Sequence, residues 1–189
     1  MEIKEYISES IAVKQELLNT PKLLNKIEKI SDIIVSSYKC GGKVLTAGNG
    51  GSAGDAQHIA GELVCKFLLN RPALNAITLT ADTSILTSVS NDLGYENSFA
   101  RQIEAYSKKG DVFIAISTSG NSQNIINAVK LAKKLEVITV GLVGSSKCQL
   151  DDLCDYIIKI PSSKTPIIQE SQLMVEHLIC GLVEEKLFS

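Results

Sequence analysis

Short runs of β-branched and other apolar residues alternate with longer helical patterns along this 189-residue chain. They show little polar–apolar alternation, and they occupy residues 44–47, 76–79, 112–116, 137–142 and 156–160. Continuous apolar runs are typical of strands that helices cover on both faces, and strand–helix alternation is typical of parallel βαβ units. We therefore predict an α/β fold, a three-layer sandwich around a five-stranded parallel sheet.

Helical patterns flank the predicted sheet. Apolar residues recur at intervals of three and four over residues 3–18 and 23–38, and Pro21 is placed to begin the second helix. Residues 167–187 carry apolar side chains on more than one helical face, which suits burial either against a neighbouring subunit or within the same one. We expect one domain over residues 1–189, with two N-terminal helices in residues 1–40 and the α/β core and C-terminal helix in residues 41–189.

Charge and apolar content exclude several classes of protein. The formal net charge is -2, and the lysines are scattered, whereas nucleic-acid-binding proteins usually carry a basic stripe. No apolar run has the length of a transmembrane helix or the form of a signal peptide, so we expect no membrane contact and a cytoplasmic location. The cysteines form no C-x-x-C pair, and we expect them to be small buried apolar residues in a reducing compartment: Cys40, Cys65, Cys148, Cys154 and Cys180.

Two Ser/Gly/Asn-rich loops follow the first and third predicted strands. The first, GNGGSAGD at residues 48–55, and the second, STSGNS at residues 117–122, each lead directly into a helical pattern. Glycines let backbone N–H groups approach an anion, and the amino end of a helix adds partial positive charge. Either loop alone is weak evidence, but two at the carboxyl ends of strands in an open α/β sheet predict a phosphate site.

Nucleotide binding is a competing interpretation of the first loop. Gly48, Gly50 and Ala53 formally satisfy the G-x-G-x-x-G/A pattern of dinucleotide-binding proteins. However, no Lys-Ser/Thr pair follows at P-loop spacing, and residues 67–70 lack the acidic side chain that would hold a ribose. A sugar phosphate is therefore the favoured ligand.

The two histidines lie on predicted helices beside carboxylates. His58 and Glu62 stand at positions i and i+4 and therefore share a face, while Glu170 and His177 are seven residues apart on one stripe of the last helix. A His/Glu pair with a distant histidine can bind zinc or serve as base and acid. The alternative is an ordinary surface pair and a histidine satisfied in the core.

A further polar pair, Asn91 and Asp92, precedes Gly94. It has the form of a helix-ending turn, and it could also reach a sugar hydroxyl.

Five separated segments carry a family resemblance. They are GNGGSAGDAQHIAGEL at 48–63, NRPALNAITLTADTS at 70–84, SNDLGYENSFARQIEA at 90–105, GDVFIAISTSGNSQNII at 110–126 and IQE at 168–170. In order and spacing they resemble the sugar isomerase (SIS) domain proteins, and among these the phosphoheptose isomerases. The resemblance implies a flavodoxin-like sandwich, a homotetramer, and conversion of D-sedoheptulose 7-phosphate to D-glycero-D-manno-heptose 7-phosphate for nucleotide-activated heptose of lipopolysaccharide or capsule.

The resemblance also implies roles for individual residues. Glu62 would be the catalytic base and His177 the acid, and one Zn²⁺ per subunit would be held by His58, Glu62, Gln169 and His177. Substrate contacts would come from Glu62, Gln169 and the loop residues Asn49, Gly50, Gly51, Asn91, Asp92, Ser117, Thr118, Ser119 and Ser122.

Two other functions remain open, and three departures bear on the details. The alternatives are an SIS isomerase of a five- or six-carbon sugar phosphate and a phosphosugar-binding adaptor that associates with the replication initiator. That adaptor type shares both loops but lacks the equivalents of Glu62 and His177, which favours the enzyme. The family commonly has Arg at Ile167, Gly-Arg at Cys65-Lys66 and His at Gln172, so phosphate contacts, subunit contacts or the choice of heptulose would be affected.

Overall fold

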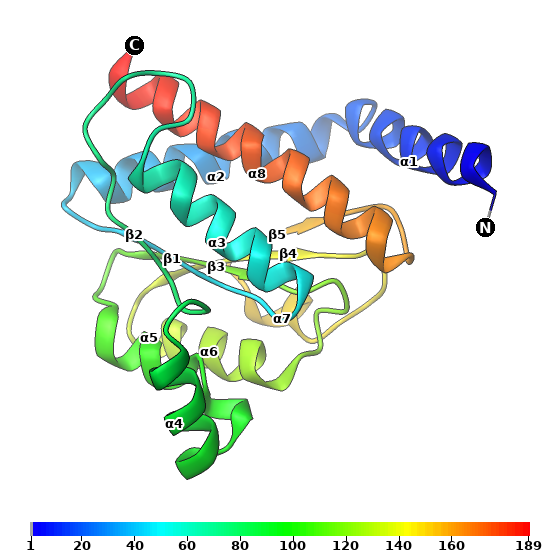
Figure 1. The fold of residues 1–189 in the computed structure, drawn as a ribbon. Helices are drawn as coiled ribbons and strands as arrows, with labels where there is room; N and C mark the ends of the chain where they lie inside the picture. The colour runs from blue at the N-terminus through cyan, green and yellow to red at the C-terminus, as the bar shows by residue number, and fades with distance from the viewer. Residues whose placement is uncertain (1) are drawn as a thin grey trace.

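The computed structural model describes residues 2–189, and its centre is one parallel sheet in the order β2-β1-β3-β4-β5 (Figure 1). The predicted five-stranded α/β sandwich is confirmed. Prediction and structure differ by at most one residue at a strand end, and the strands are β1 (Val44–Ala47), β2 (Ala76–Thr78), β3 (Val112–Ile116), β4 (Ile138–Val143) and β5 (Tyr156–Lys159).

Helices cover both faces of this sheet. On one face lie α1 (Ile3–Leu18), α2 (Pro21–Lys39), α3 (Gly51–Val64) and α8 (Thr165–Phe188). The opposite face carries α4 (Thr83–Leu93), the 3-10 turn η1 (Tyr95–Asn97), α5 (Ala100–Tyr106), α6 (Gln123–Lys134) and α7 (Leu150–Leu153). Alternate residues of β3 enter the two apolar cores, with Ile114 on the α8 side and Phe113 on the α6 side. The uninterrupted apolar runs in the sequence follow from this two-sided burial.

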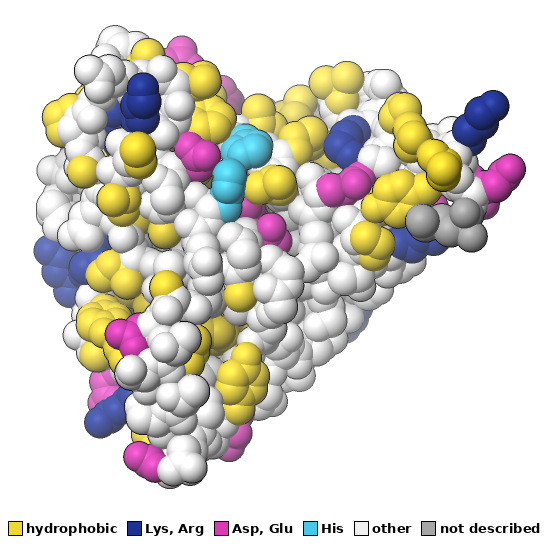
Figure 2. Space-filling view, viewed as in Figure 1, with side chains coloured by type: hydrophobic (Ala, Val, Ile, Leu, Met, Phe, Trp, Pro, Cys, Tyr) yellow, Lys and Arg dark blue, Asp and Glu magenta, His cyan; other side chains and the backbone are white. Residues whose placement is uncertain are grey.

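The terminal helices agree with their sequence patterns. Pro21 lies in the first turn of α2, and Pro166 does the same for α8, which begins slightly before the predicted residue 167. The helix α1 extends beyond the sandwich as an arm, and hydrophobic side chains lie along its surface (Figures 1 and 2), including Ile3, Ile7 and Ile11. Within residues 2–189 no helix is long and apolar enough to span a membrane.

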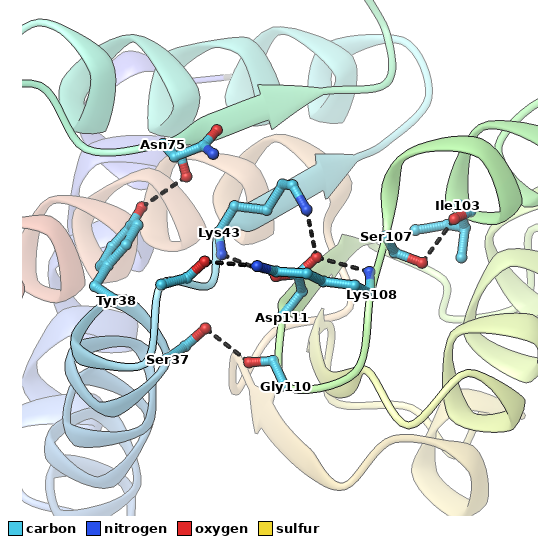
Figure 3. Close-up of polar contacts among 10 residues, drawn as sticks. Ser37, Tyr38, Lys43, Asn75, Ile103, Ser107, Lys108, Gly110 and Asp111 are labelled. Carbon is cyan, nitrogen blue, oxygen red and sulfur yellow. Dashed lines mark hydrogen bonds and ion pairs between the residues drawn. The ribbon is translucent and has the colours of Figure 1, made fainter.

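A buried carboxylate ties the amino ends of β1 and β3 together (Figure 3). Asp111 Oδ1 accepts the backbone N–H of Lys43 at 3.0 Å, while Oδ2 accepts Lys43 Nζ at 2.6 Å and the N–H of Lys108 at 2.9 Å. Ser37 Oγ adds a hydrogen bond to the carbonyl of Gly110 at 2.7 Å. These contacts lie at the amino ends of the strands, whereas ligands of open α/β sheets bind at the carboxyl ends.

The prediction for the cysteines is wrong in two cases. Cys148 and Cys180 are buried and Cys154 is partly buried, but Cys40 and Cys65 are exposed. The exposed pair occupy the residues directly after α2 and α3, where the chain leaves the helix at the protein surface. All five are free thiols.

Candidate functional site

The strand order reverses between β1 and β3, which are direct neighbours in the sheet. Their register pairs Ala47 with Ala115, so the two strands end within one residue of each other. The loop after β1 and the loop after β3 therefore meet at the carboxyl edge of the sheet. Ligands of open α/β sheets bind at such a point.

A cavity of about 370 Å³ lies between the two loops. Its lining includes seven predicted substrate contacts and adds Ser52, Ile116 and Thr165; the seven are Asn49, Gly51, Ser117, Thr118, Ser119, Ser122 and Gln169. Gly50, also predicted, precedes α3 with a φ of 57°, a left-handed conformation that glycine adopts without strain.

The walls of this cavity suit an anion. Both α3 and α6 begin at it, so the positive dipole ends of both helices lie beside it. Ser117 Oγ and Ser122 Oγ are 3.3 Å apart, which brings two hydroxyl groups to one point. Gly51 lets α8 approach closely, because a Cβ at this position would stand 2.2 Å from Gln169 Nε2.

A second polar cluster joins α3 to α8. His58 Nε2 lies 2.7 Å from His177 Nε2 and 3.4 Å from Glu62 Oε1. The His58 side chain is 40% exposed, His177 is half-buried, and Figure 2 shows the histidines at the surface beside acidic and hydrophobic side chains. Phe67 stacks on His177 with ring centroids 5.6 Å apart. The shared face predicted for His58 and Glu62 is confirmed, and His177 is not a core residue.

The donor atoms of this cluster suit a metal ion. Two imidazole nitrogens and one carboxylate oxygen lie within 4.8 Å of one another, and these are the ligand types that zinc takes in catalytic sites. Gln169, the fourth expected metal ligand, is not part of this cluster: it lines the cavity between the two loops, eight residues before His177 on α8.

Glu170 points away from the cluster. Its carboxylate forms an ion pair with Lys14 Nζ at 2.8 Å and also accepts hydrogen bonds from Ser10 and Tyr6 of α1. Although Glu170 and His177 were expected to share one face of α8, Glu170 does not reach the His58–Glu62–His177 cluster, because α1 packs beside its turn of α8.

Asn91 and Asp92 lie on the last exposed turn of α4 and are hydrogen-bonded to each other at 2.7 Å. Gly94 ends the helix with a φ of 86°, as the turn pattern predicts. Neither side chain lines the cavity. Instead Tyr95, which the sequence reasoning missed, reaches back and donates its hydroxyl to Asn49 Oδ1 at 2.7 Å.

A buried ion pair holds the segment that carries Phe67, and sequence reasoning missed this pair as well. Glu184 accepts the backbone N–H groups of Phe67, Leu68 and Leu69, and it pairs with Arg71 Nε at 2.7 Å. Burial by itself raises the pKa of Glu184, but the backbone donors and Arg71 outweigh burial and lower this pKa to about 2. No local pattern identifies the pair, because its members come from a loop and from the last helix.

Two of the family departures are buried. Ile167 lies in the core, whereas Gln172 is buried with neither amide atom hydrogen-bonded within the described chain. One helical turn further, burial and the charge of Asp55 raise the pKa of Glu176 to about 8. Lys66 is exposed.

Comparison with known proteins gives the family. The SIS domain family matches residues 5–144. Phosphoheptose isomerase 2 of Campylobacter jejuni is 53% identical over 186 residues, which cover 98% of this chain and 92% of the relative. The chain belongs to the phosphoheptose isomerase family. A second member, from Aneurinibacillus thermoaerophilus, is 52% identical over 98% of this chain and 94% of its own length.

The fold of a phosphoheptose isomerase is also recognised directly. The structure of the enzyme from Francisella tularensis superposes with a TM-score of 0.93 at 35% identity, covering 97% of this chain and 96% of that one. The resemblance read from the five sequence segments is thereby confirmed.

Proposed function

We propose that this protein is an aldose–ketose isomerase that converts D-sedoheptulose 7-phosphate to D-glycero-D-manno-heptose 7-phosphate. Two relatives that are 53% and 52% identical over 98% of this chain carry the name phosphoheptose isomerase. The observation that carries the proposal is that an anion cavity and a carboxylate–imidazole cluster share the same two helices, α3 and α8.

The distance between the anion cavity and the carboxylate–imidazole cluster favours a sugar phosphate with a long carbon chain. On α3, His58 stands seven residues after Gly51, which is about 10 Å along the helix axis. On α8, His177 follows Gln169 by eight residues, or about 12 Å. A phosphate held by the loops therefore places the far end of an extended carbon chain at the histidines.

The cluster supplies the two groups that aldose–ketose conversion requires. A base must carry a proton between carbons 1 and 2, and an acid must serve the neighbouring oxygens as the enediol forms and collapses. Glu62 is the base in this proposal, and His177 protonates and deprotonates oxygen. Phe67 packs on the His177 ring and limits its orientation.

Zinc is the metal proposed for the cluster, one ion per subunit. His58, Glu62 and His177 offer the donors. Gln169, the fourth ligand that the family resemblance implies, lines the cavity between the two loops, about 12 Å along α8 from His177. When bound, the metal would polarise the substrate carbonyl and steady negative charge.

A homotetramer is the proposed assembly. Exposed apolar side chains on the α1 arm and an apolar groove of about 600 Å³ support association of copies of this chain; the groove is lined in part by Phe67, Leu68, Leu69, Met174 and Leu178. Light scattering of the purified protein tests this proposal. We further propose a cytoplasmic reaction that feeds nucleotide-activated heptose for lipopolysaccharide or capsule.

Turnover of the wild-type protein beside Glu62→Gln and His177→Ala tests the function. We expect conversion of sedoheptulose 7-phosphate by the wild type, at least 100-fold slower conversion by both variants, and wild-type rates for Glu104→Gln, a carboxylate on α5. Preference for a five- or six-carbon ketose phosphate would reassign the substrate. Binding without turnover of any of these sugars would instead support the adaptor function.

A further inference from the structure

The side-chain amide of Asn49 forms three hydrogen bonds within the protein. Its Nδ2 donates to Asn124 Oδ1 at 2.9 Å, and its Oδ1 accepts from Asn124 Nδ2 at 2.9 Å and from the Tyr95 hydroxyl at 2.7 Å. Both acceptor positions of Oδ1 are therefore used. One N–H of the amide is left for any other partner.

These three residues come from three separate segments. Asn49 lies in the loop after β1, Asn124 lies in the first turn of α6 directly after the second phosphate loop, and Tyr95 lies in η1. A pair of amides that exchange two hydrogen bonds fixes both position and orientation. The network thus joins the two phosphate loops to each other and to the segment after α4.

We propose that Asn124 and Tyr95 are positioning residues that hold Asn49 and so set the spacing of the two phosphate loops. The side chain of Asn49 acts as the link between the loops, and its contribution to the ligand is made by the loop backbone. This inference rests on the proposed phosphosugar site and deepens it.

Burial makes Asn124 the fixed partner. The residue is 3% exposed, its Oδ1 also accepts the N–H of Ile125 at 3.0 Å, and its Nδ2 lies 3.4 Å from Ser98 Oγ. A buried amide that loses its partner is costly, so the Asn49–Asn124 pair persists in the folded protein.

Tyr95 is the adjustable member of the network. Its residue is 55% exposed, so loss of the hydroxyl leaves no buried group without a partner. The loop that it restrains contains Gly48, Gly50 and Gly51, and glycine loses more conformational freedom on ordering than any other residue. An external restraint on this loop therefore contributes directly to preorganisation of the anion site.

We expect loss of the Tyr95 hydroxyl to weaken substrate binding and to leave the rate of the chemical step unchanged. The phosphate is remote from the reacting carbons, and its contacts are equal in ground state and transition state, so weaker contacts raise KM and leave kcat unchanged. One hydrogen bond of ordinary strength corresponds to about a 3- to 10-fold change in KM.

The test compares Tyr95→Phe with the control Tyr106→Phe, since Tyr106 is an exposed tyrosine at the end of α5. KM and kcat are measured with sedoheptulose 7-phosphate, and the Kd of inorganic phosphate is measured by calorimetry. We expect Tyr95→Phe to raise KM and the phosphate Kd by about 3- to 10-fold with kcat within about 2-fold of wild type. The control should match wild type throughout.

A double variant tests the linkage itself. If Asn49 and Tyr95 act as one unit, Asn49→Ala combined with Tyr95→Phe should bind phosphate no more weakly than Asn49→Ala alone. Unchanged phosphate affinity in Tyr95→Phe, or a fall in kcat at constant KM, overturns the inference. If the wild type binds phosphate but turns over no sugar, the proposed function fails while the phosphate Kd values still decide the inference.

Discussion

Replacing Glu184 with glutamine tests how the segment that carries Phe67 is held against α8. Oε1 of Glu184 accepts the N–H groups of Leu68 and Leu69, and Oε2 accepts the N–H of Phe67 and Arg71 Nε. Glutamine has the same shape but only one acceptor oxygen, so two of these four donors would face an NH₂ group in either orientation. The substitution therefore removes charge and two hydrogen bonds without creating a cavity.

The expected loss of stability is about 3 kcal/mol. The Glu184 and Arg71 side chains are each 2% exposed, and breaking a buried ion pair costs about 3–5 kcal/mol. The lower end applies because Arg71 keeps hydrogen bonds to the carbonyls of Glu62, Leu63 and Pro72. The lowering of the Glu184 pKa from 4.5 to about 2 corresponds to a similar value of about 3 kcal/mol.

Urea unfolding monitored by circular dichroism measures this difference. Glu185→Gln is the matched control, since Glu185 is the exposed neighbour, and it should change the free energy of unfolding by less than about 0.5 kcal/mol. We also expect a lower kcat for Glu184→Gln, because Phe67 packs on His177. A destabilisation below about 1 kcal/mol would refute the reasoning that this ion pair holds the loop.

Four further predictions concern Glu184, Asp111, Glu62 and His177. Because the pKa of Glu184 is lowered to about 2, the carboxylate stabilises the fold above the ordinary glutamate pKa, and this stabilisation is lost as pH falls from about 5 toward 2. Glu184→Gln should therefore flatten this part of the curve of unfolding free energy against pH. A curve that matches the wild type would contradict this prediction. Asp111→Asn should lower the free energy of unfolding by about 3 kcal/mol, measured by thermal unfolding. KM should not change, because the cavity lies at the opposite, carboxyl ends of the strands, and a raised KM would contradict this prediction. Glu62→Gln should lower kcat at least 100-fold with an unaltered circular dichroism spectrum, and retained turnover would exclude Glu62 as base. His177→Ala should lose bound zinc, measured by plasma mass spectrometry, and full zinc content in this variant would remove His177 from the metal site.

The sheet was predictable from sequence because its strands are buried on both faces. The runs at β1 and β3 match their predicted bounds, since every residue in them is buried and apolar or hydrogen-bonded. The edge strands β2 and β5 are half-buried, and each differs from the prediction by one residue at its carboxyl end; the central strand β4 differs by one residue at both ends. The exact end of a strand depends on where its hydrogen bonds to the neighbouring strand end, and the sequence pattern does not carry that information.

The local parts of the site were also predictable. Both loops follow strands directly, and His58 and Glu62 meet because helical spacing alone brings them together. Glu170 differs, since the position of α1 beside α8 decides its partner.

The residues missed by sequence analysis owe their roles to tertiary contacts. Tyr95 and Asn124 meet Asn49 across three segments, and Arg71 meets Glu184 across more than a hundred residues. Periodicity and motif spacing describe neighbours along the chain only. These networks were therefore visible only in the folded structure.

An NMR time course of the purified wild-type protein with sedoheptulose 7-phosphate tests most directly whether this chain isomerises a seven-carbon ketose phosphate. We expect the anomeric proton signals of D-glycero-D-manno-heptose 7-phosphate to appear and to grow to a constant ratio with the ketose. A folded protein that binds the sugar phosphate but yields no aldoheptose signal would contradict the proposed isomerase function.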